Sequence, residues 1–348
     1  MSLKEHIRNQ ILEHGPMPFE EFMALALYHS DGFFGGETLR SEKAGDFLTS
    51  PEVSSLFGES LAGYITAEQL RIGDPFAVYE VGAGSGSLLR PLLNTIRVET
   101  FAIEVSPAAR RSLEVIIPPD RIHASLFDVP GPLRGVVLAN ELIDNLPMAV
   151  AQRVDGGWRE RWVGSDGEAL VFVDAAPRTE VSEWLGNFAG DVPDGGWVEV
   201  QLDAAAWMTD ALARLEAGSI VIIDYGDTSE GLLPRRGDGT LRTYRAHHLG
   251  PHPLDEPGGT DITADVNFSA LQAVAESAGA ATRLVRQDDF LGELGLRERL
   301  SRIRHSELEA ARSGNEEKRL AIRSTRTDVE TLLHPRGLGD FRVLVVSV

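Results

Sequence analysis

Short apolar runs alternate with stretches of helical periodicity from about residue 71 to the C-terminal end of the chain. This alternation predicts an α/β fold in which helices cover both faces of a mostly parallel sheet. Seven apolar runs are expected to form its strands: Ala77–Val81, Phe101–Val105, Arg121–Leu126, Gly135–Ala139, Ser219–Asp224, Ala281–Arg286 and Arg342–Val348. We expect the last of these strands to pair with the sixth.

The remaining parts of the chain predict a helical N-terminal region and two insertions. Residues 1–70 have mostly helical periodicity, and we expect them to cover the binding site as a lid, while 71–348 form the α/β domain. The first insertion, at about 148–173, contains a DGG turn at Asp155 between alternating runs, which is typical of a β-hairpin. The second, at about 227–263, is rich in Gly, Pro, His and Arg and lacks periodicity. A loop of that length is usually functional.

The first predicted strand ends in YEVGAGSGS, where Glu80 is followed by Gly82, Gly84 and Gly86. Bare backbone at the carboxyl end of a strand lets a nucleotide-type cofactor approach closely. The dinucleotide fingerprint G-x-G-x-x-G/A fits only approximately, because Ser87 occupies its last position. The carboxylate of Glu80 disfavours a pyrophosphate and suits the cationic, phosphate-free S-adenosylmethionine. We therefore expect these four residues to bind S-adenosylmethionine.

A second carboxylate, Glu104, lies at the end of the next predicted strand, eighteen residues beyond Gly86. A carboxylate at this place can accept hydrogen bonds from both hydroxyls of a ribose. NAD enzymes use the same contact, so Glu104 indicates only that the cofactor contains a nucleoside. Glu80 is the residue that distinguishes S-adenosylmethionine from NAD. Seven strands in this order suit the seven-stranded Rossmann-type sheet of S-adenosylmethionine-dependent methyltransferases.

Composition narrows the class of protein further. The 348 residues include 43% hydrophobic and 25% charged residues, which is ordinary for a globular protein. No run approaches the roughly 20 apolar residues of a membrane span. The N-terminal segment lacks the apolar core of a secretory signal, so we expect a cytoplasmic location. The absence of cysteine excludes disulfides and thiol catalysis.

The formal charge of -20 argues against a nucleic-acid partner, since such a surface repels phosphate backbones. Residues 297–326 are an exception, with nine Lys or Arg against five Glu. The segment has helical periodicity, and a solvated helical face with ion pairs between successive turns explains it better than a nucleic-acid site.

Five further motifs resemble those of the MidA-like family, which includes the mitochondrial complex I assembly-factor methyltransferase. They are GDFLTSPEVSSLFGESL at 45–61, ANELIDNLPM at 139–148, IDYG at 223–226, GTLRTYRAHH at 239–248 and PGGTDITADVNFSAL at 257–271. The resemblance extends from LYHSDGFF, which begins at Leu27, to the C-terminal end, and so covers nearly the whole chain. It implies an S-adenosylmethionine-dependent protein arginine methyltransferase, which acts in the mitochondrial case on a complex I subunit.

Methyl transfer from a sulfonium is an in-line displacement, which needs a well-placed nucleophile and the exclusion of water but no metal. Carboxylates would bind a guanidinium acceptor and take up the proton that leaves it. Candidates at strand ends and in the N-terminal motif are Glu141, Asp144, Asp224 and Asp46, with Glu141 and Asp144 ranked first. Asp144 also suits the N-cap of a short helix.

Three more residues are candidates for cofactor binding. Asp128 follows the third predicted strand and resembles the acidic residue that accepts from the adenine amino group in many such enzymes, although it also suits a turn. Asn140 ends the fourth predicted strand, where ligands bind in this architecture. Ser50 suits an N-cap with Pro51 at the first helical position, and that helix N-terminus could face the cofactor carboxylate.

Two other functions remain open. One is a non-catalytic, S-adenosylmethionine-binding assembly factor for a respiratory complex. The other is an NAD-dependent oxidoreductase, which Glu80 and the lack of a Tyr-x-x-x-Lys motif disfavour. As partners we expect a protein with an arginine as methyl acceptor, and a homodimer is one option for the chain itself.

Overall fold

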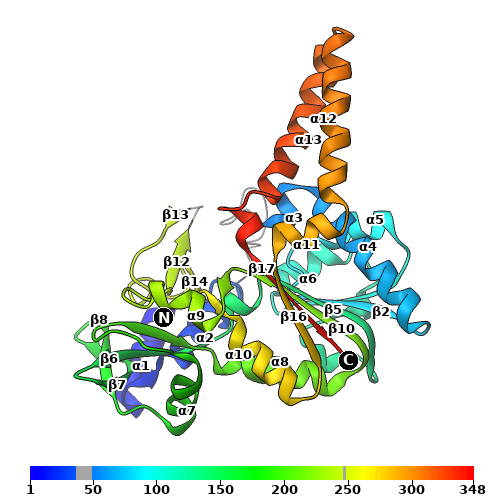
Figure 1. Cartoon of the computed structure of the whole chain (residues 1–348). Coiled ribbons are helices and arrows are strands. Elements are labelled where there is room, and N and C mark those ends of the chain that lie inside the picture. The colour runs from blue at the N-terminus through cyan, green and yellow to red at the C-terminus, as the bar shows by residue number, and fades with distance from the viewer. Residues whose placement is uncertain (37–48, 246–247) are drawn as a thin grey trace.

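The computed structural model describes residues 1–36, 49–245 and 248–348 (Figure 1). Its largest sheet has seven strands in the order β16-β17-β10-β5-β2-β3-β4. These strands are β2 (Ala77–Val81), β3 (Glu99–Ile103), β4 (Ile122–His123), β5 (Leu133–Asn140), β10 (Leu215–Asp224), β16 (Ala281–Arg286) and β17 (Arg342–Ser347). Neighbours are parallel except at β17, which runs antiparallel to both β10 and β16. Each predicted strand overlaps one of these seven, and the expected pairing of the last with the sixth is confirmed.

Alternating side chains of the central strands fill two apolar layers, one on each face of the sheet. Along β10, Ile220 and Ile222 face one layer, while Val221 and Ile223 face the other. The first layer is completed by α8 (Leu202–Arg214) and α10 (Phe268–Ser277). The second is completed by α4 (Ser55–Ile72), α5 (Leu89–Thr95), α11 (Gln287–Glu293), the N-terminal end of α12 (Leu296–Arg312) and the C-terminal end of α13 (Glu316–Leu332). A smaller layer packs α6 (Pro107–Leu113) against β3. The predicted α/β fold is confirmed.

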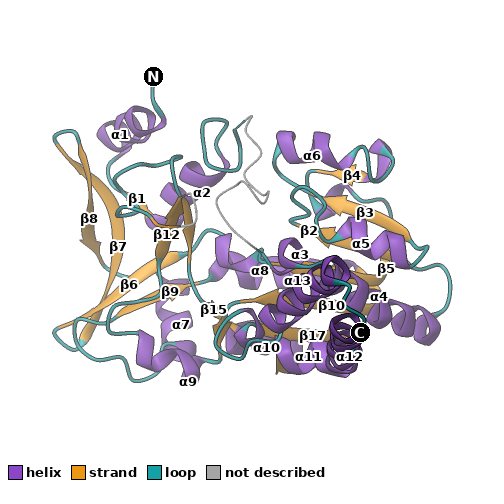
Figure 2. Ribbon diagram, turned by 90° about the horizontal axis from the view of Figure 1, so that it is seen from above, coloured by secondary structure: helices purple, strands orange, loops and turns teal. Residues whose placement is uncertain are grey.

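A second sheet, antiparallel and five-stranded, lies beside the first (Figure 2). It contains β1 (Met17–Pro18), β6 (Ala149–Val154), β7 (Gly157–Asp166), β8 (Ala169–Ala175) and β9 (Trp197–Val200). The predicted hairpin is present, because β6 and β7 pair across the turn at Asp155. The inserted structure continues beyond residue 173, because β9 pairs with β6 and α7 (Thr179–Phe188) packs on these strands through Trp184 and Leu185.

The N-terminal helices divide between the two sheets. Helices α1 (Leu3–His14) and α2 (Phe19–Tyr28) pack on the second sheet, in a core that includes Phe22 and Val163. Helix α4 instead packs on the main sheet through Phe57 and Leu61. The first 70 residues therefore do not pack as one unit, and the division at residue 70 stays a prediction. Asp46 lies outside the described residues.

The described part of the second insertion is structured, although its sequence has no periodicity. It contains β12 (Arg242–Arg245) between β13 (His248–Leu249) and β14 (Asp261–Thr263), together with the short helix α9 (Ser229–Leu232). Immediately before α10, β15 (Val266–Asn267) pairs in parallel with β11 (Gly226–Asp227).

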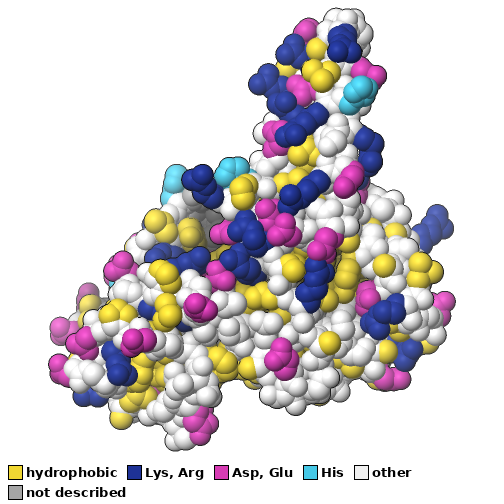
Figure 3. Space-filling model, in the orientation of Figure 1, with side chains coloured by type: hydrophobic (Ala, Val, Ile, Leu, Met, Phe, Trp, Pro, Cys, Tyr) yellow, Lys and Arg dark blue, Asp and Glu magenta, His cyan; other side chains and the backbone are white. Residues whose placement is uncertain are grey.

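A helical hairpin of α12 (Leu296–Arg312) and α13 (Glu316–Leu332) projects from the main sheet (Figure 1). Many of its side chains are charged (Figure 3), and ion pairs such as Arg304–Glu330, at 2.9 Å, and Arg326–Glu307, at 3.2 Å, link the two helices. This arrangement agrees with a solvated, ion-paired helical face. None of the described helices is both long and apolar enough to cross a membrane.

Candidate functional site

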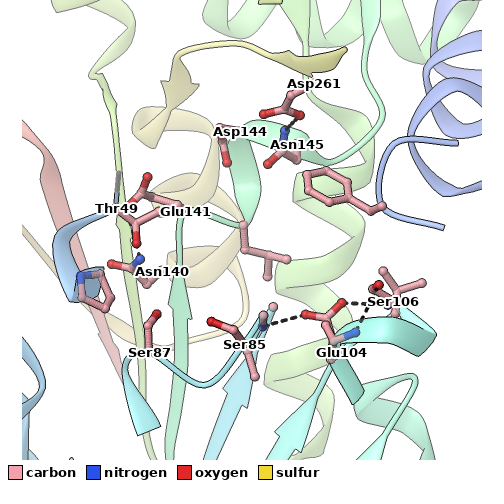
Figure 4. Close-up of a pocket in the computed structure, with 18 of the residues that line it drawn as sticks. Thr49, Ser85, Ser87, Glu104, Ser106, Asn140, Glu141, Asp144, Asn145 and Asp261 are labelled. Carbon is pink, nitrogen blue, oxygen red and sulfur yellow. Dashed lines mark hydrogen bonds between the residues drawn. The ribbon is translucent and has the colours of Figure 1, made fainter. Parts of the chain in front are cut away.

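A cavity of about 430 Å³ lies at the carboxyl ends of β2, β3 and β5, the edge at which ligands bind in parallel α/β sheets. The glycine loop after β2 and the start of the segment after β3 form one end of it. The turn after β5, the end of α2, α3 (Ser50–Val53) and β14 form the other walls. Figure 4 shows Ser85 and Glu104 at one end and Asp144, Asn145 and Asp261 at the other.

The glycine loop needs glycine because its backbone is left-handed at three positions. The φ angles of Gly82, Gly84 and Gly86 are 74°, 52° and 81°, in a region that residues with a side chain rarely adopt. The N–H of Gly82 donates to the carbonyl of Ile103 at 2.8 Å, which joins the loop to the end of β3. Gly82 and Gly84 line the cavity, whereas a Cβ on Gly86 would lie 2.2 Å from Ile116.

Glu104 is buried, and each of its two carboxylate oxygens accepts a hydrogen bond from a backbone N–H group. Oε2 accepts from the N–H of Gly84 at 2.8 Å, and Oε1 accepts from the N–H of Ser106 at 2.7 Å. Burial raises the pKa of Glu104, and these hydrogen bonds oppose the shift. Each oxygen keeps a further lone pair, so the carboxylate can accept from ribose hydroxyls where the sequence predicted it would.

Two buried acceptors at this end of the cavity have no partner among the described residues. They are Oε2 of Glu80 and Oδ1 of Asn140, and both residues line the cavity. Burial and, to a lesser degree, the charge of Glu104 raise the pKa of Glu80 well above its usual range. A ligand with hydrogen-bond donors and positive charge would satisfy these atoms, and S-adenosylmethionine carries both.

Glu141 begins the turn after β5 in an unusual backbone conformation. Its φ of 50° is left-handed, which is costly for a residue other than glycine and is often found at functional sites. The N–H of Glu141 donates to the carbonyl of Ile223 at 2.8 Å, which fixes this conformation. Its Oε1 accepts from Asn140 at 3.3 Å and from the N–H of Ser50 at 3.4 Å. Burial, with the charge of Asp144, raises the pKa of Glu141 to about 8.

Asp144 lies three residues further on, inside the turn η3 (Ile143–Asn145), and is only 3% exposed. The hydroxyl of Tyr225 donates to its Oδ2, and its Oδ1 has no partner in the described part of the chain. Burial raises the pKa of Asp144 to about 7. The N-cap of η3 is Leu142, so the alternative capping role does not apply to Asp144.

Asp224 is fully buried at the end of β10 and does not line the cavity. Its Oδ2 accepts from the N–H groups of Ile143 and Asp144 at 3.0 and 3.3 Å, and its Oδ1 accepts from the N–H of Tyr225 at 3.0 Å. These are the contacts of a residue that holds the turn. Burial, and then the charges of Asp144 and Glu141, raise the pKa of Asp224 well above its usual range.

Besides Gly86, two predicted cofactor residues lie outside the cavity lining. Asp128 is exposed, and its carboxylate accepts from the N–H of Ser125 at 3.1 Å within a short turn. Ser50 is buried and contacts Gln287 in addition to Glu141. The N-cap of α3 is Thr49 rather than Ser50, because the helix begins one residue earlier than the sequence suggested.

Several cavity residues were not identified individually from the sequence. The hydroxyl of Tyr28 donates to the carbonyl of Asn145 at 3.0 Å, and the amide of Asn145 donates to Asp261 at 2.8 Å. Tyr225 and Phe341 add aromatic walls, with ring centroids 5.6 Å apart. Of these, Tyr28, Asn145, Tyr225 and Asp261 lie in the five motifs or in LYHSDGFF, so the motifs were the available signal.

The described residues contain no group of three or more His, Asp or Glu side chains placed to hold a metal ion. The cavity therefore offers carboxylates, amides, backbone and aromatic rings. Its two ends differ in chemistry, with a backbone-bound carboxylate beside the glycine loop and less fully bonded carboxylates in the turn after β5. Such an arrangement can hold a nucleoside at one end and a cationic group at the other.

Comparison with known proteins agrees with this chemistry. Residues 60–285 match a family model described as "Putative S-adenosyl-L-methionine-dependent methyltransferase". A Drosophila melanogaster protein named "Protein arginine methyltransferase NDUFAF7 homolog, mitochondrial" is 29% identical, over 90% of this chain and 80% of its own. The Mus musculus "Protein arginine methyltransferase NDUFAF7, mitochondrial" is 30% identical, over 85% of this chain and 74% of its own.

A solved structure is also similar over nearly the whole chain. It is a "likely methyl transferase" from Burkholderia thailandensis, bound to S-adenosyl-homocysteine, and it is 28% identical to this chain. The two structures superpose with a TM-score of 0.86, over 99% of this chain and 92% of that one. The similarity thus includes the second sheet and the insertions as well as the main sheet.

Proposed function

The chain belongs to the family of S-adenosylmethionine-dependent methyltransferases, and we propose that it methylates an arginine side chain of a protein. The observation that carries this proposal is the pair of carboxylates with raised pKa values, the half-buried Glu141 and the buried Asp144, in the wall of the cofactor cavity. The names of the fly and mouse relatives, both protein arginine methyltransferases, support it. The order of the sheet, with the glycine loop after β2, supports the predicted Rossmann-type methyltransferase fold.

In this proposal the cofactor end of the cavity holds the methyl donor. Glu104 accepts from the ribose hydroxyls, and the backbone of Gly82 and Gly84 gives the close approach that a flat nucleoside needs. Glu80 and Asn140 accept from the remaining donors of the ligand through their unpaired oxygens. When bound, S-adenosylmethionine supplies an electrophilic methyl group on a positively charged sulfur.

The acceptor end of the cavity suits a guanidinium in two ways. Glu141 and Asp144 have raised pKa values because their charges are buried without a cation, and a bound guanidinium would compensate both. The aromatic rings of Tyr28, Tyr225 and Phe341 offer flat faces against which a planar cation can stack. The carboxylates then orient the guanidinium and exclude water from the nitrogen that reacts.

The identity of the protein substrate rests on the resemblance to the MidA-like family. We propose a respiratory complex I subunit, by analogy with the mitochondrial assembly factor of that family. The expected cytoplasmic location stays a prediction, which the mitochondrial names of the relatives do not support. A homodimer also stays a prediction.

Methyl-labelled S-adenosylmethionine, incubated with the protein and a lysate of its own host, tests the proposal. We expect a labelled protein in which mass spectrometry places the methyl group on arginine. A methyl group on lysine, on a carboxylate or on a small molecule would reject the arginine acceptor. Cofactor binding without any turnover would favour the non-catalytic assembly factor. The Gly84→Val protein should not bind cofactor, so its reaction measures the labelling that does not depend on this enzyme.

A further inference from the structure

We infer that Tyr225 positions Asp144 so that Oδ1 of Asp144 takes up the proton leaving the acceptor nitrogen. This inference rests on the proposed function and divides the work between the two acceptor-side carboxylates. Glu141 and Asp144 lie in one turn and line the same cavity, yet their hydrogen-bond partners differ. This difference in hydrogen-bond partners separates the carboxylate that takes up the proton from the one that binds the cation.

Tyr225 is held on its backbone and on its ring. Its N–H donates to Asp224 at 3.0 Å, and its carbonyl accepts from the N–H of Val266 at 3.0 Å. Its ring packs edge-on against Phe341, with the centroids 5.6 Å apart. A side chain anchored in this way presents its hydroxyl at a fixed point, and there the hydroxyl donates to Oδ2 of Asp144.

The backbone of Asp144 is fixed as well. Its N–H donates to Asp224 at 3.3 Å, and its carbonyl accepts from the N–H of Ala264 at 3.2 Å. With Oδ2 bound to Tyr225, the carboxylate cannot rotate freely, and Oδ1 stays without a partner among the described residues. A buried acceptor in the wall of a cavity is a place for a proton or a donor from the ligand.

Glu141 is placed differently. Its Oε1 already accepts from Asn140 and from the N–H of Ser50, and its backbone is held at a φ of 50°. These contacts orient Glu141 and oppose the rise in its pKa, and a bound guanidinium would compensate its charge. Both hydrogen bonds of Glu141 reach Oε1, so its Oε2 has none in the described part of the chain. Asp144 differs because a side-chain hydroxyl from another segment holds its Oδ2 and leaves Oδ1 as a buried acceptor without a partner among the described residues. The leaving proton is therefore placed on Asp144.

The reaction then balances within the cavity. A nitrogen of the acceptor guanidinium forms a bond to the methyl carbon, and the bond between that carbon and the sulfonium sulfur breaks, which leaves neutral S-adenosyl-homocysteine. The methylated nitrogen loses one proton to Oδ1 of Asp144, and solvent takes that proton when the product leaves. Tyr225 keeps its own proton and acts only through its hydrogen bond to Oδ2.

The pH dependence of this step reflects every ionisable group around Asp144. From its own turn and from β10 these are Glu141 and Asp224, and from the neighbouring segments they are Tyr28, Tyr225, Asp261 and Asp265. Only Tyr225 is seen to donate a side-chain hydrogen bond to the carboxylate of Asp144 in the described part of the chain. This bond favours the charged carboxylate, so its removal should raise the pKa of Asp144.

The test is Tyr225→Phe, which keeps the ring and removes the hydroxyl. With labelled cofactor and synthetic peptides that each contain one arginine, we expect the acidic limb of kcat/KM to move up by about one pH unit. Activity should fall about fivefold near pH 7, approach a roughly tenfold loss at lower pH and recover at higher pH. Cofactor affinity should not change. The matched control is Tyr64→Phe, which removes a hydroxyl bonded to Ser219 at 2.8 Å, away from the cavity.

An infrared titration of the protonated carboxyl band tests whether Tyr225 affects the pKa of Asp144, and it does not depend on turnover. The band of Asp144 is identified as the one that Asp144→Asn lacks. In Tyr225→Phe this band should persist to higher pH than in the wild type. An unchanged carboxyl titration and an unchanged pH profile in Tyr225→Phe would overturn the inference. A methyl group found on another acceptor, with the carboxyl titration still shifted, would instead reject only the arginine acceptor.

Discussion

The two ends of the cavity use carboxylates in opposite ways. At the cofactor end, each oxygen of Glu104 accepts from a backbone N–H, at 2.8 and 2.7 Å. At the acceptor end, Oδ1 of Asp144 has no partner among the described residues, and Glu141 has a left-handed backbone. Glu104 is therefore already oriented in the protein alone, whereas Glu141 and Asp144, like Glu80 beneath the glycine loop, carry buried charge that a ligand would have to balance.

This contrast shows how the two halves of a transferase site can be stabilised separately. Backbone donors orient Glu104 without any need for a second charge, so a ribose finds its acceptor in place. Glu141 and Asp144 repel each other, and burial disfavours their charged forms, so the site favours a cation that can compensate both. The predictions below test whether the two ends act independently.

The largest effect is expected for Gly84→Val at the cofactor end. Gly84 has a φ of 52°, and its N–H binds Glu104, so a β-branched side chain would strain the loop and intrude on the cavity. We expect affinity for S-adenosyl-homocysteine to fall roughly 100-fold or more. Calorimetry measures this affinity, and circular dichroism verifies that the variant is folded.

Gly167→Val is the matched control for that change. Gly167 has a φ of 60° in the turn between β7 and β8, and a Cβ there would meet nothing within 4 Å. It therefore carries a similar backbone strain without touching the cavity, and its cofactor affinity should stay at the wild-type level. Unchanged affinity in a folded Gly84→Val protein would remove the cofactor from the glycine loop.

Glu141→Gln should separate the two ends most clearly. The neutral amide keeps the shape of the side chain but no longer compensates the charge of a guanidinium. We expect methyl transfer to fall roughly 100-fold. Cofactor affinity should stay within about threefold of the wild type, because the change leaves the glycine loop intact. Single-turnover kinetics with labelled cofactor measures the rate of methyl transfer, and calorimetry measures the cofactor affinity. Full activity of the variant would exclude a role for Glu141 while leaving the site otherwise as proposed.

Glu104→Ala should have the reverse effect. The change removes the acceptor for the ribose and leaves the N–H groups of Gly84 and Ser106 without their partner. We expect cofactor binding to weaken by roughly 1.5–3 kcal/mol, which is about 10- to 150-fold. Methyl transfer at saturating cofactor should fall much less. If the affinity changes by less than about twofold, the ribose is held elsewhere.

The cofactor end could be predicted from the sequence because its residues are close along the chain. Gly84 and Glu104 are 20 residues apart and end neighbouring parallel strands, so an alternating pattern and a glycine loop suffice to place them together. The same rule placed Glu141 and Asp144 at the carboxyl end of β5. It also placed Asp224 there, but it could not show that backbone N–H groups of Ile143 and Asp144, about 80 residues away, occupy its carboxylate.

The rest of the acceptor end depends on contacts between distant segments. Tyr225 and Asp144 are 81 residues apart, and Asn145 and Asp261 are 116 apart, so no local pattern indicates either pair. The second sheet was missed for a related reason. Its strands include the two residues of β1 and the four of β9, which are too short to show a period, and α7 separates β9 from the predicted hairpin.

The smallest effect we expect concerns stability, and it follows from the uncompensated charge at the acceptor end. In the folded protein the pKa of Glu141 is about 8, above its value in the unfolded chain, so the folded state binds the extra proton between these two pKa values. The stabilisation is present in full below the unfolded pKa and is lost as the pH rises through about 8. Glu141→Gln removes this dependence, so the free energy of unfolding should fall less between pH 5 and pH 8.5, by about 1–3 kcal/mol. Urea unfolding at several pH values measures the difference, with Glu114→Gln, an exposed change at the end of α6, as the control. Equal pH dependence in the wild type and Glu141→Gln would mean that Glu141 is charged in the free protein, and the contrast between the two ends would then disappear.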